Sequence, residues 1–250
     1  MKSGMGLFYH LGLYSTFIVR VFGKPERFKL YVKNFFYEVF SLGIGSLGIV
    51  VIISFFMGAV VTLQTAYNFE SPIIPLYLIG LTARDSMLLE FSSTIVALIL
   101  AGKVGSNIAS EIGTMRVTEQ IDALEIMGIN PAAFLIRPKI LGMMFIIPFL
   151  TIISMFVGIV GGFLASVGTG VLTAHDYLYG IHYVFIPWYV FYSLIKSVVF
   201  AFIYTSVPAY YGFFVSGGAL EVGQSSTKAV VASSILILIF NLILTQILLA

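Results

Sequence analysis

Few side chains in this sequence are suited to covalent or metal chemistry. Cysteine is absent and the three histidines are scattered, so neither a thiolate metal site nor a nucleophile paired with a base is apparent. His175, Asp176 and His182 could be imagined as metal ligands, but no further ligand of suitable spacing lies near them. A P-loop requires G-x-x-x-x-G-K-[ST], and the nearest match, at 102–104, lacks the upstream glycine and the hydroxyl residue. We therefore expect a protein with no catalytic residue, metal or cofactor of its own.

The polar residues that stand out are those inside long apolar stretches. An ionised Glu90 at membrane depth would cost about 2.5 to 3.5 kcal/mol unless it is paired or hydrated. Glu90 is therefore either a functional residue or a carboxylate at headgroup level that faces water. Gln64 could bind lipid oxygens or a neighbouring helix. Lys196, near the start of an apolar stretch, could extend outward to the interface.

Composition identifies the class of protein that must position these residues. Of the 250 residues, 59% are hydrophobic and only 10% are charged, whereas soluble domains carry about 25% charged residues. The net charge of +2 is too small to indicate nucleic-acid binding. The sequence therefore predicts an all-α integral membrane protein.

Five stretches are apolar enough to cross the ~30 Å hydrocarbon core of a bilayer, at 40–66, 86–102, 140–171, 189–215 and 229–250. Glycines at 43, 45, 48 and 58, and the Gly158/Gly162 pair, indicate close helix contacts. We interpret residues 1–36 as an N-terminal helix lying in the interface, with a short true span as the alternative. Its basic flank consists of Arg20, Lys24, Arg27, Lys29 and Lys33.

The distribution of basic residues predicts the orientation. With a cytoplasmic N-terminus, all of the 13 Lys and Arg residues except Arg84 and Lys196 lie on the cytoplasmic side. Because basic residues in short loops resist translocation, we expect the N-terminus inside and the C-terminus outside. The same count places the polar segment between the second and third spans, 106–128, in the cytoplasm.

That segment has the pattern of a short amphipathic helix. Val117, Ile121, Leu124 and Gly128 recur at helical spacing, and Thr114 or Thr118 could cap the start. Gly128, followed by Asn130-Pro131, predicts a helix stop. Such a helix could lie on lipid headgroups, but lipid-bound helices are usually basic and this one is acidic. We therefore favour docking to a protein partner, as a coupling helix does.

Three sequence segments resemble the MlaE-type permeases, the membrane subunits of ABC phospholipid transporters. The segments are AGKVGS at 101–106, EIGTMRVTEQIDAL at 111–124 and IKSVVFA at 195–201. The middle motif is long and specific, and the spacing of the spans agrees over about residues 40–250. The resemblance implies one permease domain over 1–250, with the interfacial helix, five spans and a cytoplasmic coupling helix between spans 2 and 3.

The resemblance also implies partners and a function. Such permeases form a homodimer that binds two cytoplasmic ATPase subunits, which bind the ATP, and periplasmic MCE-domain proteins. They move phospholipid between the bacterial inner membrane and the MCE carriers, which maintains the lipid asymmetry of the outer membrane. Mapped by motif, the lipid-binding positions are Val61, Gln64, Asn68, Phe69, Leu89 and Glu90. The ATPase-coupling positions are Glu111, Arg116, Thr118, Glu119, Gln120, Asp122, Ala123, Leu124 and Glu125.

The sequence departs from the family pattern at one of these positions. The family commonly has Arg-Glu-x-Gly-Pro where this chain has Leu89-Glu90-Phe91-Ser92-Ser93. Arg84, about two turns earlier, could replace the missing arginine if the helix extends that far. The alternative function is an ion-coupled secondary transporter, which would usually show inverted repeats and several acids at mid-membrane depth. Neither feature is evident.

Overall fold

The computed structural model describes residues 3–23, 28–69 and 75–249, and the regular structure in these ranges is entirely helical. Five helical stretches are long and apolar enough to cross a membrane, which confirms the predicted all-α, five-span class. Their bounds are Leu30–Asn68, Tyr77–Val117, Ala132–Gly168, Trp188–Phe213 and Ala219–Leu249. Lys24 and Arg27 of the predicted basic flank lie outside the described residues.

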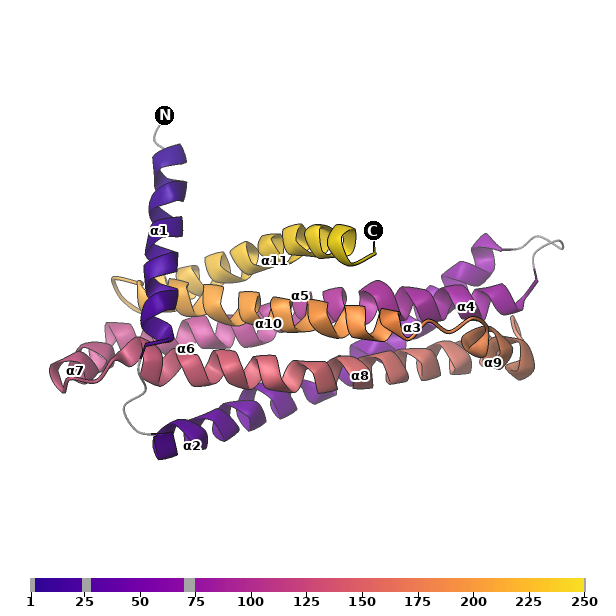
Figure 1. Ribbon diagram of the computed structural model, residues 1–250, viewed down its shortest axis with the longest axis horizontal. Coiled ribbons are helices and arrows are strands. Elements are labelled where there is room, and N and C mark those ends of the chain that lie inside the picture. Colours follow the sequence, from indigo (N-terminus) through magenta and orange to yellow (C-terminus); the bar gives the residue numbers. More distant parts are fainter. Residues whose placement is uncertain (1–2, 24–27, 70–74, 250) are drawn as a thin grey trace. The chain divides into compact units, whose positions relative to one another are not determined.

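The first three stretches are each built from several helical segments (Figure 1). The first joins α2 (Phe28–Glu38), the π-helical η1 (Val39–Gly43), the 3-10 turn η2 (Ile44–Ser46) and α3 (Leu47–Asn68). The second joins α4 (Tyr77–Ser86), η3 (Met87–Ile95), α5 (Val96–Leu100), η4 (Ala101–Gly105) and α6 (Ser106–Val117). The third joins η5 (Ala132–Ile136) and α8 (Arg137–Gly168); η3, η4 and η5 are also π-helical.

The other helices are α1 (Ser3–Val21), α7 (Gln120–Ile126), α9 (Ala174–His182), α10 (Trp188–Phe213) and α11 (Ala219–Leu249). The helices of the first two spans are longer than the apolar stretches in the sequence. Charged residues near their ends, such as Arg84 and Glu111, have ion-pair partners within the chain, so the helix continues past the apolar stretch.

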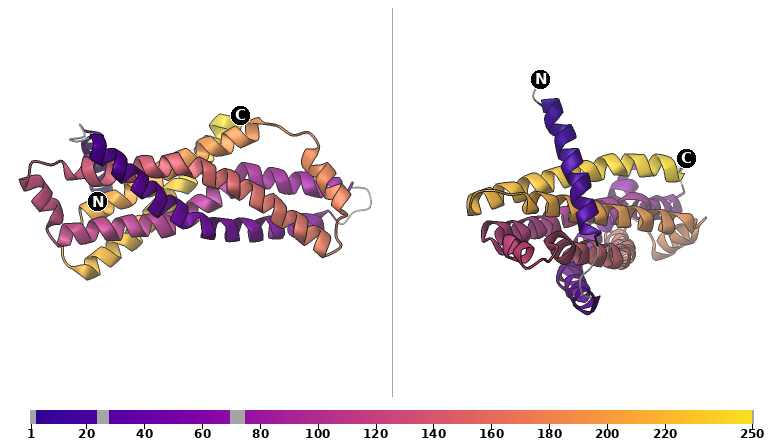
Figure 2. Two further views of the ribbon diagram at one scale, coloured as in Figure 1. Left: turned by 90° about the horizontal axis from the view of Figure 1, so that it is seen from below. Right: turned by 60° about the vertical axis from the view of Figure 1, so that its left-hand side comes forward.

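The chain forms two compact units. The first comprises Met1–Ile44, Leu100–Phe145 and Ala201–Ile237, and the second Gly45–Ile99, Ile146–Phe200 and Leu238–Ala250. In the first unit, α1 runs across α6 and the neighbouring end of α10 (Figure 1 and the right-hand view of Figure 2). The buried Phe17 of α1 packs on Tyr210, Phe213 and Phe214, and Tyr14 forms a 2.7 Å hydrogen bond with Ser206. A helix held across the spans in this way is consistent with the predicted interfacial position.

In the second unit, glycines let α3 and α8 come into backbone contact. A Cβ atom at Gly58 would overlap the carbonyl group of Gly158, and one at Gly162 would overlap Thr62. Ser54 of α3 also donates a 2.7 Å hydrogen bond to Ser154 of α8. The close contacts expected at Gly58 and at the Gly158/Gly162 pair are confirmed. Gly48 makes no such contact within the chain, because nothing lies within 4 Å of a Cβ placed there.

This contact leads to a prediction about two alanine substitutions in α3. Gly58→Ala should destabilise the protein by about 1 to 3 kcal/mol, because the added methyl group must push the two backbones apart. Gly48→Ala is the matched control and should be neutral or slightly stabilising, since alanine favours the helix and meets no neighbour. Thermal unfolding of the two purified variants compares them. A Gly58→Ala protein as stable as the Gly48→Ala protein would contradict the close approach.

The short helix α9 packs against the core of the second unit. Tyr177 of α9 belongs to a core cluster with Ala66, Ile79 and Leu172, against which Phe69 packs. Burial raises the pKa of Tyr177 to about 12, so its hydroxyl stays protonated and donates to the Ile159 carbonyl. These contacts hold the end of α3 next to α4 and α9.

Candidate functional site

Glu90 is the centre of a polar network within the second unit. Its carboxylate accepts hydrogen bonds from Lys196 Nζ at 2.9 Å, Thr94 Oγ1 at 3.0 Å and Asn241 Nδ2 at 3.1 Å. Lys196 Nζ also donates to the hydroxyl of Tyr192, at 2.9 Å. Each of η3, α10 and α11 supplies two members four residues apart, which places them on one helix face. The pairs are Glu90/Thr94, Tyr192/Lys196 and Asn241/Thr245.

Lys196 is the buried end of the ion pair. Its side chain is 0% exposed, whereas that of Glu90 is 40% exposed. The expectation that Lys196 extends outward to the interface is therefore wrong. Its position on the inner face of α10 directs the ammonium group to Glu90 and to the carbonyl of Leu89. Glu90 in turn has the partner that its depth in the span requires.

The side chain of Glu90 lines a shallow hollow of about 420 Å³ on one face of α4 and η3. Apolar side chains line it at Leu81, Leu89 and Phe91, and polar ones at Thr82, Asp85, Ser86 and Glu90. The hollow thus combines apolar and hydrogen-bonding surface, as sites for amphipathic ligands do. It also coincides with the π-helical η3, a type of distortion that is frequent at functional sites.

The other predicted lipid-binding residues lie on α3 or directly after it. Gln64 and Asn68 are exposed, Val61 is buried, and Phe69 packs on the cluster around Tyr177. Gln64 and Asn68, one turn apart, are therefore open to a ligand, whereas Val61 is buried and Phe69 is half-buried against the cluster. Leu89 and Glu90 are the two predicted residues that the structure places together in a hollow.

Arg84 does not take the place of the family arginine that is missing at Leu89. The helix does extend far enough, but the guanidinium group is buried and bound to the chain itself. It pairs with Asp85 and donates to the carbonyls of Ile181 and Tyr183, at 2.6 and 2.9 Å. The next residue, Val184, has a φ of 44°, a strained conformation for a β-branched residue. We infer that Arg84 stabilises this turn.

The predicted coupling helix is interrupted by a break. The helix of the second span continues through α6 to Val117, and the separate α7 begins after Glu119, which adopts a left-handed φ of 61°. The expectation that Thr114 or Thr118 caps the helix is wrong, because both hydroxyls donate to carbonyls four residues earlier. The stop at Gly128 is confirmed. Gly128 has a φ of 77°, and the Ile129 amide closes the end by donating to the Leu124 carbonyl.

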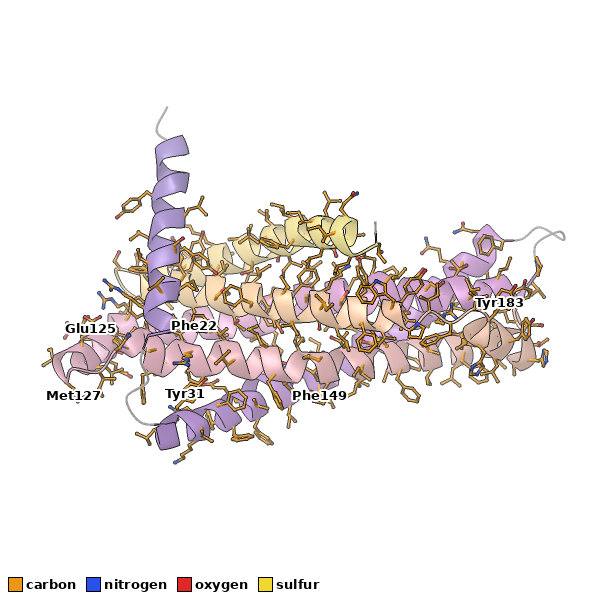
Figure 3. All side chains as sticks on the ribbon, viewed as in Figure 1. Phe22, Tyr31, Glu125, Met127, Phe149 and Tyr183 are labelled. Carbon is orange, nitrogen blue, oxygen red and sulfur yellow. The ribbon has the colours of Figure 1, made fainter. Side chains whose placement is uncertain are left out.

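The apolar stripe of this segment faces the protein, and its tip faces outward. Ile121 is fully buried in the first unit, with Val117 and Leu124 half-buried. By contrast, Ile126 is 88% and Met127 65% exposed. Figure 3 shows Glu125 and Met127 at the outer end of α7. The exposed surface at α7 therefore consists of an apolar tip beside the polar residues Glu119, Gln120 and Glu125, with the small Ala123 between them.

Several of the predicted coupling residues form ion pairs inside the first unit. Arg116 pairs with Asp122 across the break between α6 and α7. Glu111 accepts from Lys139 Nζ, which also contacts the buried Glu38 at 2.7 Å. Lys139 thereby connects α6, α2 and α8. The coupling segment is therefore held in place by the ion pairs of Arg116, Asp122 and Glu111. The side-chain amide of Gln120 donates a hydrogen bond to the hydroxyl of the exposed Thr118.

Two of the three residues considered as metal ligands have other contacts. Asp176 forms a capping contact with Thr173 at the start of α9, and His175 stacks on Tyr179. Across the described part of the chain, no group of three potential ligands is placed to hold a metal ion.

With this geometry established, comparison with known proteins decides the family. The sequence model of the family described as Permease MlaE matches residues 35–247. The chain belongs to the MlaE permease family. A probable ABC transporter permease protein of Rickettsia bellii is 34% identical over 250 residues, covering 98% of this chain and 94% of that protein. A protein of Synechocystis with the same description is 35% identical over 218 residues, covering 85% of this chain and 81% of its own length.

A plant relative extends the comparison. The chloroplastic protein TRIGALACTOSYLDIACYLGLYCEROL 1 of Arabidopsis thaliana is 31% identical over 218 residues, which is 87% of this chain and 62% of the plant protein. MlaE permeases are membrane subunits of ABC transporters, so this chain is a multi-pass permease whose ATPase is a separate subunit. Because the chain belongs to the MlaE permease family, an ABC transporter permease is favoured over an ion-coupled secondary transporter.

Proposed function

We propose that this permease moves phospholipid between the bacterial inner membrane and periplasmic MCE-domain carrier proteins, and so maintains outer-membrane lipid asymmetry. It acts as a homodimer, with two cytoplasmic ATPase subunits docked on α7 and the C-terminus in the periplasm. The lipid site includes Gln64, Asn68, Leu89 and Glu90. Hydrolysis of ATP in the partner, transmitted through residues 106–128, reshapes this site.

The hollow beside Glu90 is the observation that carries the proposal. A phospholipid presents polar headgroup oxygens next to apolar chains, and the hollow presents Thr82 and Ser86 next to Leu81, Leu89 and Phe91. Glu90 is fixed by Lys196, so a polar group stays open to the hollow at membrane depth. The name of the plant relative, which contains that of a glycolipid, further supports lipid as the cargo class.

The exposed tip of α7 supports the coupling role. Ile126 and Met127 lie side by side at the end of α7 with most of their surface exposed, which is the arrangement of an apolar anchor that a partner protein buries. The flanking acids would direct this tip to a basic groove of the ATPase. The Arg116–Asp122 pair links α7 to α6, and the Glu111–Lys139 pair links α6 to α8. A displacement of α7 by the ATPase would therefore move α6 and α8 as well.

Filling the hollow tests the lipid proposal. Ser86→Trp places a large side chain in it and should reduce several-fold the phospholipid that co-purifies with the protein, measured by mass spectrometry of extracted lipid. Ile152→Trp, on an exposed face of α8, is the matched control and should retain the wild-type amount. Binding of the ATPase subunit should be equal in both variants. Undiminished phospholipid in the Ser86→Trp protein, or a predominance of lipids without phosphate in the wild type, would contradict the proposal.

A further inference from the structure

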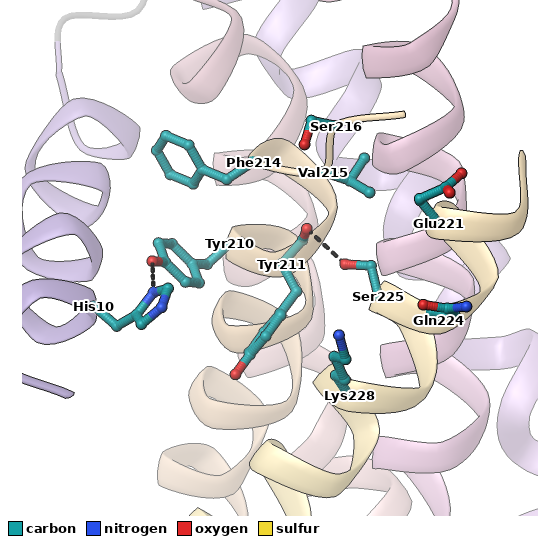
Figure 4. Close-up of a pocket in the computed structure, with 10 residues that line it drawn as sticks. All are labelled: His10, Tyr210, Tyr211, Phe214, Val215, Ser216, Glu221, Gln224, Ser225 and Lys228. Atoms are coloured by element: carbon teal, nitrogen blue, oxygen red, sulfur yellow. Dashed lines mark hydrogen bonds between the residues drawn. The ribbon is translucent and has the colours of Figure 1, made fainter. Parts of the chain in front are cut away.

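A second hollow, of about 450 Å³, lies within the first unit and has no role in the proposed transport path. Figure 4 shows its walls: His10 from α1, Tyr210 and Tyr211 from α10, Phe214 directly after α10, and Gln224 and Lys228 from α11. The volume is in the range of small-molecule and headgroup sites. Its lining differs from that of the hollow beside Glu90, because it contains a lysine.

Lys228 is an exposed cation that lacks an internal partner. It forms no hydrogen bond or ion pair with any residue that the structure describes. In Figure 4 its ammonium group points toward the space between Tyr211 and Ser225. The one acid of the lining, Glu221, lies two turns away, and its carboxylate accepts the Gly218 amide at 2.7 Å. The part of the hollow around Lys228 is therefore positive and suited to an anion.

The aromatic residues around the hollow indicate its depth in the membrane. His10 Nδ1 and the Tyr210 hydroxyl are hydrogen-bonded at 2.9 Å, and Tyr14 bonds to Ser206 beside them. Bands of such amphipathic rings occur at the headgroup level of membranes. The helix that supplies His10, α1, runs across α6 and the neighbouring end of α10, as a helix lying in the interface would (Figure 1). Amphipathic rings around the hollow are therefore of the kind that lie at the level of lipid phosphate groups.

We propose that this hollow binds the phosphate of a phospholipid headgroup, with Lys228 as its counter-ion. The Gln224 amide and the Tyr211 hydroxyl line the same space and can donate to phosphate oxygens. The rings of Tyr210 and Phe214 give the adjoining glycerol and acyl region an apolar wall. This site goes beyond the proposed cargo site, since all of its residues lie in the first unit. A bound lipid would fasten α1 to α10 and α11.

Photo-crosslinking of the full-length protein tests this site. The probe is a phosphatidylglycerol with a photoreactive group next to the phosphate, and peptide mapping locates the adducts. Labelling of the peptides that contain Tyr211 and Lys228 should be about fivefold weaker in Lys228→Gln, the effect of losing one lysine near an anionic headgroup. Lys33→Gln removes another exposed lysine of the first unit and should leave labelling unchanged. A diacylglycerol with the same photoreactive group, which has no phosphate, should not label these peptides.

Competition by inorganic phosphate separates a lipid site from a site for free phosphate. The lipid site predicts that millimolar inorganic phosphate leaves the labelling intact, because free phosphate cannot use the apolar wall. Displacement of the lipid by inorganic phosphate would overturn the headgroup assignment. Equal labelling of Lys228→Gln and wild type, or equal labelling by the diacylglycerol probe, would overturn the site itself. Loss of cargo lipid in Ser86→Trp is independent of these outcomes.

Discussion

Glu90→Gln is expected to destabilise the protein by about 3 to 5 kcal/mol, more than Lys196→Met, although the two residues form one ion pair. The glutamine leaves Lys196 charged in a position with 0% exposure and without a counter-ion. Lys196→Met removes the partner of Glu90, but that carboxylate lines the open hollow and keeps its bonds from Thr94 and Asn241. We expect a loss of about 1 to 3 kcal/mol there.

The measurement is the free energy of unfolding in mixed micelles, with the double variant Glu90→Gln/Lys196→Met included. The double variant should be more stable than Glu90→Gln alone, because it no longer buries an unpaired charge. Lys33→Met, at an exposed lysine, controls for the general effect of losing a positive charge and should change stability by less than about 0.5 kcal/mol. Equal losses for the two single variants would show that the burial of Lys196 does not determine the energetics.

Ile126→Glu is expected to weaken binding of the ATPase subunit about 30-fold, without affecting the fold. The side chain is 88% exposed, so the substitution removes almost no internal contact. In the complex, an apolar tip buried in the partner would be a hot spot, and such residues contribute about 2 kcal/mol or more. The added carboxylate would also have to be desolvated.

Binding of the purified ATPase to immobilised permease gives the affinity, and thermal unfolding checks the fold. Leu220→Glu is the matched control, since Leu220 is 70% exposed in the first unit but lies at the start of α11. Its affinity should remain that of the wild type. If Leu220→Glu weakened binding as strongly as Ile126→Glu, the contact would not be specific to the tip of α7.

The coupling segment shows which local features could be read from the sequence. The stop at Gly128 can be predicted, because glycine adopts the left-handed conformation that ends a helix and Asn130-Pro131, two residues later, favours a turn. The break before α7 was not predictable. It depends on Glu119 in a left-handed conformation, for which glutamate has no preference, and on the Arg116–Asp122 pair across the break. The helical spacing predicts the apolar stripe, but the burial of the stripe against the chain itself depends on tertiary packing.

The Glu90 network shows what was missed at the candidate site and which signal was present. The depth of Glu90 in a span predicts that it is important, but depth alone does not identify Tyr192, Asn241 and Thr245 as members of its network. Each lies four residues from another polar side chain in an apolar helix, a pattern that indicates a shared face. Three such pairs on three spans could have suggested one network. Which spans are neighbours, however, is decided by helix packing, as in the glycine contact of α3 with α8.

ATP-dependent lipid transfer in a reconstituted system tests the central claim most directly. The permease and its ATPase subunit are placed in liposomes that contain a fluorescent phospholipid, and an MCE-domain protein outside serves as the second lipid-binding partner. We predict that lipid exchange between liposome and carrier depends on both subunits and on ATP hydrolysis, and that Ile126→Glu reduces it. Exchange driven by an ion gradient without the ATPase, or hydrolysis with no movement of phospholipid, would contradict the account.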